Sequence, residues 1–174
     1  HPLFDLHGRV QRLLDFADLR KREMDLRDKA GRDLLTGLFN RRGLQAAVNS
    51  LKAEDFPLAV YLFDLDDLKK VNDTYGHSMG DRMISSFAEW LRRNARSGDI
   101  LCRYGGDEFT VIMRHFCHSE NARKKGEMIC RSFCEDFAKE SGVIAACSCG
   151  VAMCEKHDLS LDGILARADQ ALYH

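Results

Sequence analysis

The sequence predicts a compact α/β domain over residues 32–174, preceded by a long helix over residues 1–31. Residues 57–63 form a near-continuous apolar run that ends in acidic residues, which is typical of a buried central strand. Residues 100–104 and 109–113 alternate apolar side chains around Gly105-Gly106, which is a strong hairpin signal. Segments of helical periodicity separate these strands, so helices are expected to flank a sheet.

The N-terminal helix is predicted from apolar residues at 4-3 spacing and from the near absence of Gly and Pro. Two interpretations stand about even: a coiled-coil stalk that pairs two copies, or a helix packed on its own domain. Arg20 and Arg27 interrupt the apolar seam. The seam contains Leu6, Val10, Leu13, Ala17 and Met24, with Phe16, Leu19 and Leu26 as a neighbouring stripe.

Periodicity also predicts the remaining elements of the domain. Helices are expected over residues 66–74, 78–95, 120–139 and 161–173, and a further strand over 143–153. In the second of these helices, Met83, Ile84, Phe87, Ala88 and Leu91 make the apolar stripe.

Charge and hydropathy limit the classes of partner. The net charge is −1, so we expect neither a nucleic-acid polymer nor a membrane surface as partner of this segment. No apolar run approaches the ~20 residues of a membrane span, and a cytoplasmic location is expected. Because the chain begins at His1, we expect it to be part of a longer protein with an upstream sensory domain. The sequence does not decide whether that longer protein is anchored to a membrane.

The cysteines number seven and include no C-x-x-C pair. Cys130 and Cys134 are one helical turn apart, and Cys147 and Cys149 would share one face of a strand. Since paired clusters at zinc spacing are missing, we expect reduced thiols packed as small apolar side chains.

Acidic residues gather at two positions that predict a metal site. Asp107 and Glu108 directly follow the Gly-Gly turn, where neighbouring carboxylates repel each other and a divalent cation would relieve that repulsion. Asp64, Asp66 and Asp67 lie where the apolar strand is expected to end.

The segment after Asp64 is expected to open a helix, whose free N–H groups and nearby Lys69 and Lys70 favour phosphate. Carboxylates for Mg²⁺ beside groups for phosphate indicate a nucleotide site. Taken alone, Asp66 and Asp67 are also explained as a solvated acidic helix start.

The hairpin segment Arg103-Tyr-Gly-Gly-Asp-Glu-Phe109 closely resembles the signature of the diguanylate cyclase family, the GGDEF domains. The resemblance runs from Asp33 to the end of the chain. Four further stretches match the family in order: residues 33–42, 63–73, 75–81 and 168–173.

This resemblance implies a central mixed, mainly antiparallel sheet flanked by helices, as in nucleotidyl cyclases and polymerase palms. It also implies a nucleotidyltransferase that condenses two GTP into cyclic di-GMP and two pyrophosphates across a homodimer interface. The product is expected to inhibit the enzyme.

The resemblance assigns metal and catalytic roles. Asp64, Glu108 and the Leu65 carbonyl would hold Mg²⁺ or Mn²⁺, two ions per half-site, with Asp107 as a second-metal ligand or a helper in deprotonating the 3′-hydroxyl. Lys69 would contact phosphate.

The resemblance also assigns nucleotide and inhibitory sites. Asn72 and Asp81 would read the guanine edge, and Asp67 and Leu68 would border the nucleotide. Arg96 and Asp99 would bind cyclic di-GMP at an inhibitory site. Three further residues, Asp33, Asn40 and Arg41, are expected to be caps and polar links, and His77 is expected to have a structural role in a turn.

The sequence departs from the family pattern at two points. Leu68 replaces a common aromatic residue, which is an apolar substitution. The chain stops at His174, where the family continues with a lysine and an arginine that touch the triphosphate, so slow turnover is expected of this segment.

Other functions stay open. A catalytically silent module that binds GTP or cyclic di-GMP is the main alternative, although the intact Gly105–Phe109 motif argues against it. A purely structural dimerisation module and an enzyme with a related cyclic dinucleotide product are the others.

Overall fold

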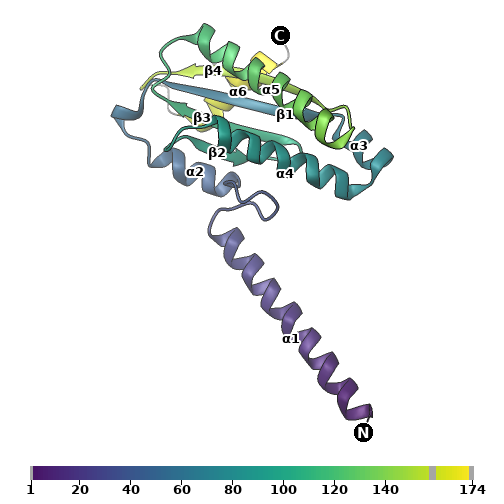
Figure 1. The fold of residues 1–174 in the computed structure, drawn as a ribbon. Coiled ribbons are helices and arrows are strands. Elements are labelled where there is room, and N and C mark those ends of the chain that lie inside the picture. The colour runs from purple at the N-terminus through teal and green to yellow at the C-terminus, as the bar shows by residue number, and fades with distance from the viewer. Residues whose placement is uncertain (1, 157–159, 173–174) are drawn as a thin grey trace.

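The structure is a computed structural model that describes residues 2–156 and 160–172. Its elements follow one another along the chain as shown in Figure 1. They are α1 (Pro2–Lys29), α2 (Arg41–Asn49), the short 3-10 helix η1 (Ala53–Asp55), β1 (Leu58–Asp66), α3 (Leu68–Tyr75), α4 (His77–Asn94), β2 (Ile100–Arg103), β3 (Glu108–Arg114), α5 (Ser119–Ser141), β4 (Ala146–Cys154) and α6 (Leu161–Leu172).

The four strands form one sheet in the order β2-β3-β1-β4, and each neighbouring pair is antiparallel. A parallel bridge also joins Phe39, which lies outside the strands, to Cys102 of β2. The predicted class, an α/β domain with a mainly antiparallel sheet, is therefore confirmed. The apolar run of the sequence belongs to β1, which is one of the two inner strands of this sheet, and this position explains why its residues are buried on both faces.

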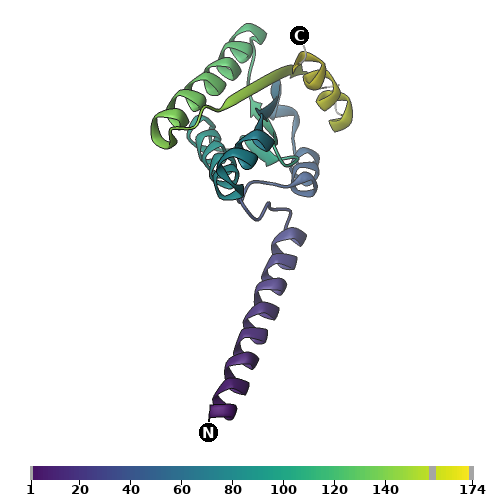
Figure 2. The same cartoon turned by 90° about the vertical axis from the view of Figure 1, so that its right-hand side faces the viewer.

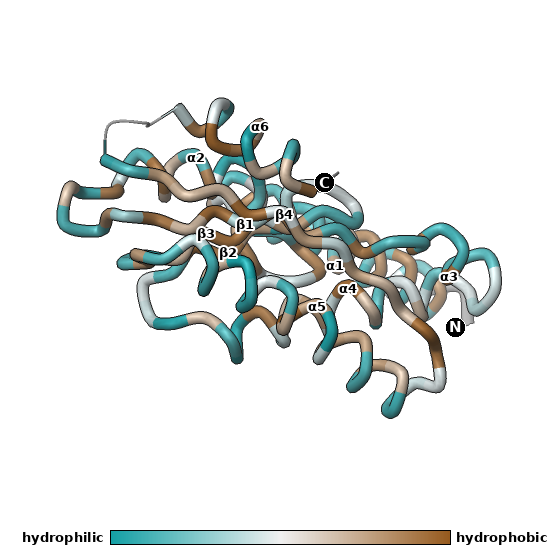
Figure 3. The backbone as a smooth tube through the Cα atoms, turned by 90° about the horizontal axis from the view of Figure 1, so that it is seen from above, coloured by the Kyte–Doolittle hydropathy of each residue, from teal (hydrophilic) through white to brown (hydrophobic). Residues whose placement is uncertain are grey.

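Helices cover both faces of the sheet (Figure 2). Tyr61, Phe63 and Leu65 of β1 face α4 and α5, in a core whose centre is Phe87. The alternate residues of β1 face α2 and α6, as expected of a strand with period two. In Figure 3 the central strands have mostly apolar colours, and the helices around them alternate between polar and apolar colours.

Helix α1 extends away from the domain in both Figure 1 and Figure 2. Its apolar side chains are exposed, with Leu13 at 68% and Phe16 at 59%. The interpretation that this helix packs on its own domain is therefore wrong. Among the described residues, no helix combines the length and apolar character needed to cross a membrane.

Some predicted boundaries differ from the structure. Asp66 was expected to open a helix, but it belongs to β1, because that strand stays paired with β4 through Asp66 and Ala146. His77 does not lie in a turn; it is the first residue of α4. The helix α2 and η1 were not predicted, and Tyr173, the expected end of the last helix, lies outside the described residues.

The expected polar links are present in the segment between α1 and α2. Asp33 forms an ion pair with Arg103 at 3.2 Å, and both side chains are largely buried. The Arg41 Nε donates a hydrogen bond to the Tyr104 carbonyl at 2.8 Å. Asn40 caps α2 by accepting an N–H bond at 2.9 Å. The interactions of Asp33 and Arg41 tie the start of the domain to the β2–β3 hairpin.

Candidate active site

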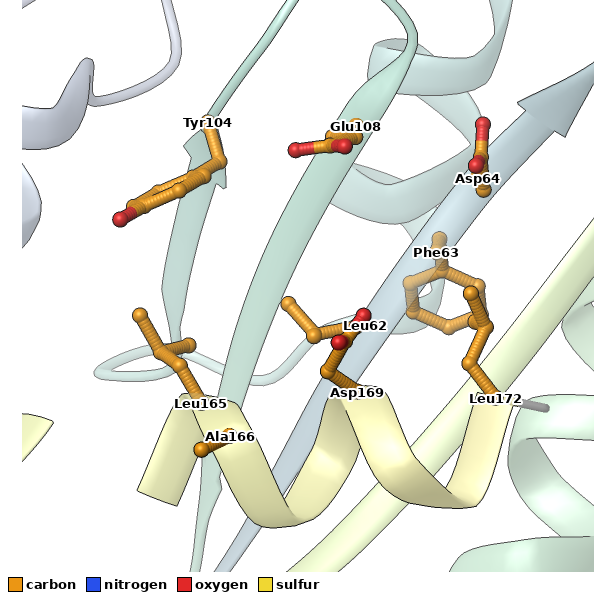
Figure 4. Close-up of a pocket in the computed structure, with 9 residues that line it drawn as sticks. All are labelled: Leu62, Phe63, Asp64, Tyr104, Glu108, Leu165, Ala166, Asp169 and Leu172. Atoms are coloured by element: carbon orange, nitrogen blue, oxygen red, sulfur yellow. The ribbon is translucent and has the colours of Figure 1, made fainter. Parts of the chain in front are cut away.

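The acidic cluster is built by the pairing of β1 with β3. Asp64 lies directly opposite Glu108 in this ladder, and the Leu65 N–H donates to the Asp107 carbonyl at 2.9 Å. Phe63 and Leu65 are buried on the face toward α4 and α5, so the Asp64 side chain lies on the other face. Figure 4 shows the Asp64 and Glu108 carboxylates on the same side of the sheet. The structure thus brings the predicted metal residues together.

A cavity of about 250 Å³ lies beneath these carboxylates and is closed by α6 (Figure 4). Two of its polar lining residues, Tyr104 and Asp169, were not predicted as site residues. Tyr104 stands just before the Gly-Gly turn and Asp169 in the final helix, so both lie within stretches that match the family. Their place in these stretches could have identified them as site residues. The lining residues are Leu62, Phe63, Asp64, Tyr104, Glu108, Leu165, Ala166, Asp169 and Leu172.

The cluster carries an electrostatic cost. Burial, followed by the negative charges of Asp107, Asp66 and Glu108 in that order, raises the pKa of Asp64 to about 6. A bound divalent cation would favour the ionised form instead.

The donor set fits Mg²⁺ chemically. Within residues 2–156 and 160–172, no group of at least three Asp, Glu, His or Cys side chains is already gathered as a metal site. Mg²⁺ usually binds one or two carboxylates together with waters and substrate phosphates. Asp64 and Glu108 can therefore serve without a third protein side chain.

The chain turns from β1 into α3 at Asp67. This residue has φ 59°, in the left-handed region that Asp tolerates better than most residues. The first helical bond runs from the Val71 N–H to the Asp67 carbonyl, so the preceding amides of α3 have no partner inside the helix. Lys69 is exposed in this first turn, and Leu68 packs against the core.

Asp66 does not contribute to that helix start. Its carboxylate accepts a short hydrogen bond from the Ser148 hydroxyl of β4. The interpretation of Asp66 as a solvated residue of an acidic helix start is therefore wrong, whereas Asp67 is exposed at the N-cap.

Asn72 belongs to α3 and Asp81 to α4, two helices that pack against each other. The Asn72 Oδ1 is buried and has no hydrogen-bond partner. It lies over Gly80, where an added Cβ would be only 1.8 Å away. Asp81 follows Gly80 and is exposed. A buried polar atom without a partner is unfavourable, so a ligand that donates to it would be stabilised. Neither residue lines the cavity beneath the carboxylates.

Arg96 and Asp99 lie in the turn between α4 and β2. The Asp99 carboxylate accepts the N–H of Arg96 at 2.8 Å and the N–H of Arg114 at 3.1 Å, while the Arg96 side chain is exposed. Arg114 is at the end of β3 that pairs with Leu58, opposite to the Glu108 end. This turn and the acidic cluster are therefore two separate places.

The fold and the acidic cluster define an α/β domain of the nucleotidyl cyclase type. Residues 30–174 match the family model described as "Diguanylate cyclase, GGDEF domain". Because the match covers most of the chain, this protein belongs to the diguanylate cyclase GGDEF family.

Curated relatives share this domain. The diguanylate cyclase DosC of Escherichia coli is 31% identical over 153 residues, which cover 84% of this chain and 33% of DosC. The cyclic di-GMP phosphodiesterase PdeR of Escherichia coli is 30% identical over 161 residues, 91% of this chain and 24% of PdeR. The chain thus spans no more than a third of the length of these relatives.

A similar solved structure is that of the coiled coil and GGDEF domain of DgcB from Caulobacter crescentus, in complex with c-di-GMP. It aligns with a TM-score of 0.69 and 25% identity, over 97% of this chain and 92% of that chain.

Replacing Asp64 by Asn should raise the melting temperature of the metal-free protein at pH 8. The raised pKa means that the folded state holds this proton more tightly than the unfolded state, so stability falls as the pH rises from about 4 to about 6. With allowance for solvent screening, removing the charge should raise the free energy of unfolding at pH 8 by about 1 kcal/mol, which corresponds to a rise in melting temperature of roughly 2–4 °C.

Thermal melts in a chelator at pH 4 and pH 8 measure this effect, with Asp18→Asn on the exposed face of α1 as the matched control. An equal rise in melting temperature at both pH values, or no rise at pH 8, would contradict the electrostatic explanation.

Proposed function

We propose that this domain is an active diguanylate cyclase that condenses two GTP into cyclic di-GMP. The observation that carries this proposal is the convergence of Asp64, Asp107 and Glu108 at the ends of β1 and β3, within an intact Gly105–Phe109 motif. The match to DosC, a diguanylate cyclase, supports the same activity.

In this proposal Asp64 and Glu108 bind the metal ions, Mg²⁺ or Mn²⁺ and two per half-site, with help from the Leu65 carbonyl. The ions would neutralise phosphate charge and polarise the α-phosphate. Asp107 completes the cluster and helps to take the proton of the 3′-hydroxyl. The new bond joins that oxygen to the α-phosphorus of the other GTP, and the bond to the β-phosphate breaks, so pyrophosphate leaves.

The nucleotide would be bound from α3 and α4. The Asn72 amide, whose Oδ1 is buried, and the exposed Asp81 carboxylate offer an acceptor and donor set for the guanine edge. The free amides at the start of α3 and the nearby Lys69 would bind phosphate, with Asp67 and Leu68 at the border. The buried unpaired Asn72 oxygen gives this assignment its structural support.

Catalysis requires two copies, because each domain would hold one GTP. Helix α1 (within the proposed stalk, residues 1–31) offers an exposed apolar seam suited to pairing in parallel with a second copy. The domain over residues 32–174 would then face its partner. A sensory domain upstream and a cytoplasmic location, where GTP is available, complete the proposal.

A second candidate is a silent domain that binds GTP or cyclic di-GMP and regulates a partner. The observation in its favour is the match to PdeR, a phosphodiesterase, over 91% of this chain. The intact acidic motif makes the active enzyme the better-supported function.

Glu108→Gln should lower turnover of GTP to cyclic di-GMP by at least about 100-fold, because a neutral amide binds a divalent cation poorly. The measurement is chromatography of products from GTP and Mg²⁺, with this chain and with one extended beyond His174. Exposed Glu54→Gln is the matched control. Tight GTP binding without cyclic product from either unmodified chain would favour the silent candidate, and an active Glu108→Gln protein would remove Glu108 from the metal site.

Gly80→Ala should weaken GTP binding roughly 10-fold, because the added Cβ displaces the Asn72 amide while the helix itself accepts alanine. Titration calorimetry with GTP and ATP measures the loss and should show reduced preference for guanine. Gly163→Ala, whose Cβ meets only Ser160 at ordinary contact distance, is the control. Unchanged GTP affinity in a folded Gly80→Ala protein would remove Asn72 from the base site.

Arg96→Ala should weaken inhibition by cyclic di-GMP roughly 10-fold or more, because a guanidinium–phosphate or guanidinium–guanine contact is lost. The inhibition constant is measured from initial rates at increasing product concentration. Arg93→Ala, at an exposed position nearby in α4, is the control. An inhibition constant that does not change would exclude Arg96 from the inhibitory site.

A further inference from the structure

Four cysteines gather where α5 packs against β4. Cys130 and Cys134 come from α5, and Cys147 and Cys149 come from β4. The Sγ atoms of Cys130 and Cys147 are 3.0 Å apart. All four thiols are free. The cluster belongs to the sheet face that packs on α5, whereas the Asp64 carboxylate is on the other face.

Gly126 explains why the helix and the strand approach so closely. A Cβ at this position would lie 2.7 Å from the Cys149 Sγ and 3.1 Å from the Tyr61 ring. Only glycine therefore allows this part of α5 to lie directly on β4, one turn before Cys130. The Tyr61 hydroxyl, which donates to the Ala122 carbonyl at 2.8 Å, holds the same helix against β1.

The cluster is reachable from solvent. A groove of about 420 Å³ opens over it, whereas Cys102 and Cys154 are fully buried elsewhere in the domain. A small oxidant can therefore reach these sulfurs. The groove is lined by Glu127, Cys130, Arg131, Cys134, Ala146, Cys147 and Cys149.

Cys130 lies against Cys147 of β4, with the two sulfurs in contact. Hydrogen bonds with Cys147 and Cys149 lower the pKa of the Cys130 thiol, against the opposing effects of burial and of Asp66 and Glu127. A thiolate is the reactive form of cysteine, so this position favours attack on an oxidant.

We propose that Cys130 and Cys147 form a peroxide-sensitive dithiol that closes to a disulfide between α5 and β4. Cys130 attacks hydrogen peroxide, so that an S–O bond forms, the O–O bond breaks and hydroxide leaves as water after protonation. Cys147 then attacks the Cys130 sulfur, an S–S bond forms, the S–O bond breaks and a second water leaves. Two thiols are oxidised as one peroxide is reduced, and the sulfurs need to approach by only about 1 Å.

The disulfide would join the strand next to the acidic cluster to the helix behind it. Cys147 pairs with Leu65 across the β1–β4 ladder, and the next residue, Ser148, pairs with Asp64 and bonds to Asp66. Closing the bond would therefore restrain β4 at the level of the metal residues. We expect the melting temperature to rise by roughly 5–10 °C on oxidation and to return on reduction.

Peptide mapping of the intact chain tests the proposal directly. The protein is treated with one equivalent of hydrogen peroxide, its remaining thiols are blocked with N-ethylmaleimide, and it is digested with trypsin. Cys130 then lies in peptide 126–131, Cys134 in 132–139, and Cys147 in 140–156. The expected product is peptide 126–131 joined to 140–156 and separated again by a reducing agent.

Serine variants identify the partner. Cys147→Ser should slow formation of this cross-link at least about 10-fold, whereas Cys149→Ser and the exposed control Cys117→Ser should keep it. Unchanged cross-linking in Cys147→Ser, or a cross-link to peptide 132–139 in its place, would overturn the assignment.

A zinc-binding measurement distinguishes a peroxide-sensitive cysteine pair from a metal-binding cysteine cluster. If peroxide produces no cross-link and the chain instead retains Zn²⁺ through gel filtration, with the metal lost in Cys130→Ser, the cluster is a thiolate metal site and the disulfide proposal is wrong.

Discussion

The pairing of β1 with β3 holds negative charges closer together than they would remain in water. Asp64 and Glu108 face each other because the ladder sets their register, and the Leu65–Asp107 hydrogen bond extends that ladder into the turn. Burial and the neighbouring negative charges raise the pKa of Asp64, so the ionised form of this residue is disfavoured in the folded protein. The site therefore depends on a sheet stable enough to oppose their repulsion.

The aromatic core behind the sheet supplies that stability. The Phe87 ring of α4 makes edge contacts with Phe63 of β1 at 5.5 Å and with Phe109 of β3 at 4.9 Å. These residues are buried neighbours of Asp64 and Glu108 in the chain, so packing beneath the strands fixes the acids above them. Such aromatic contacts contribute about 0.5–1.5 kcal/mol each beyond the area they bury.

The two faces of β1 carry different kinds of side chain on one strand backbone. One face carries the acids and the cavity under α6, and the other packs on α4 and α5. Ser148 and Cys147 of β4 show the same division, since the first bonds to Asp66 and the second contacts Cys130. Because these two residues are neighbours in β4, the two faces are connected through one strand backbone.

The sequence by itself determined the inner strand, the hairpin and the positions of the acids, because these depend on local period and turn chemistry. Residues 57–63 could be recognised as a buried strand, and Gly105-Gly106 as a turn, without any knowledge of their partners. The hairpin motif and the end of the strand each carried a carboxylate signal, and the structure places Asp64 opposite Glu108. Their role as metal ligands stays a prediction. The family resemblance added Asn72 and Asp81, but it gave no reason for their position.

Only the tertiary structure decided which distant residues meet. Local pattern could not show that β1 continues through Asp66, since that extension depends on pairing with β4. Nor could it show that α1 stands free of the domain, that Asn72 lies over Gly80, or that Cys130 meets Cys147. Each of these depends on contacts between elements far apart in the chain, and the free energy of such contacts is set by packing and not by local sequence preference.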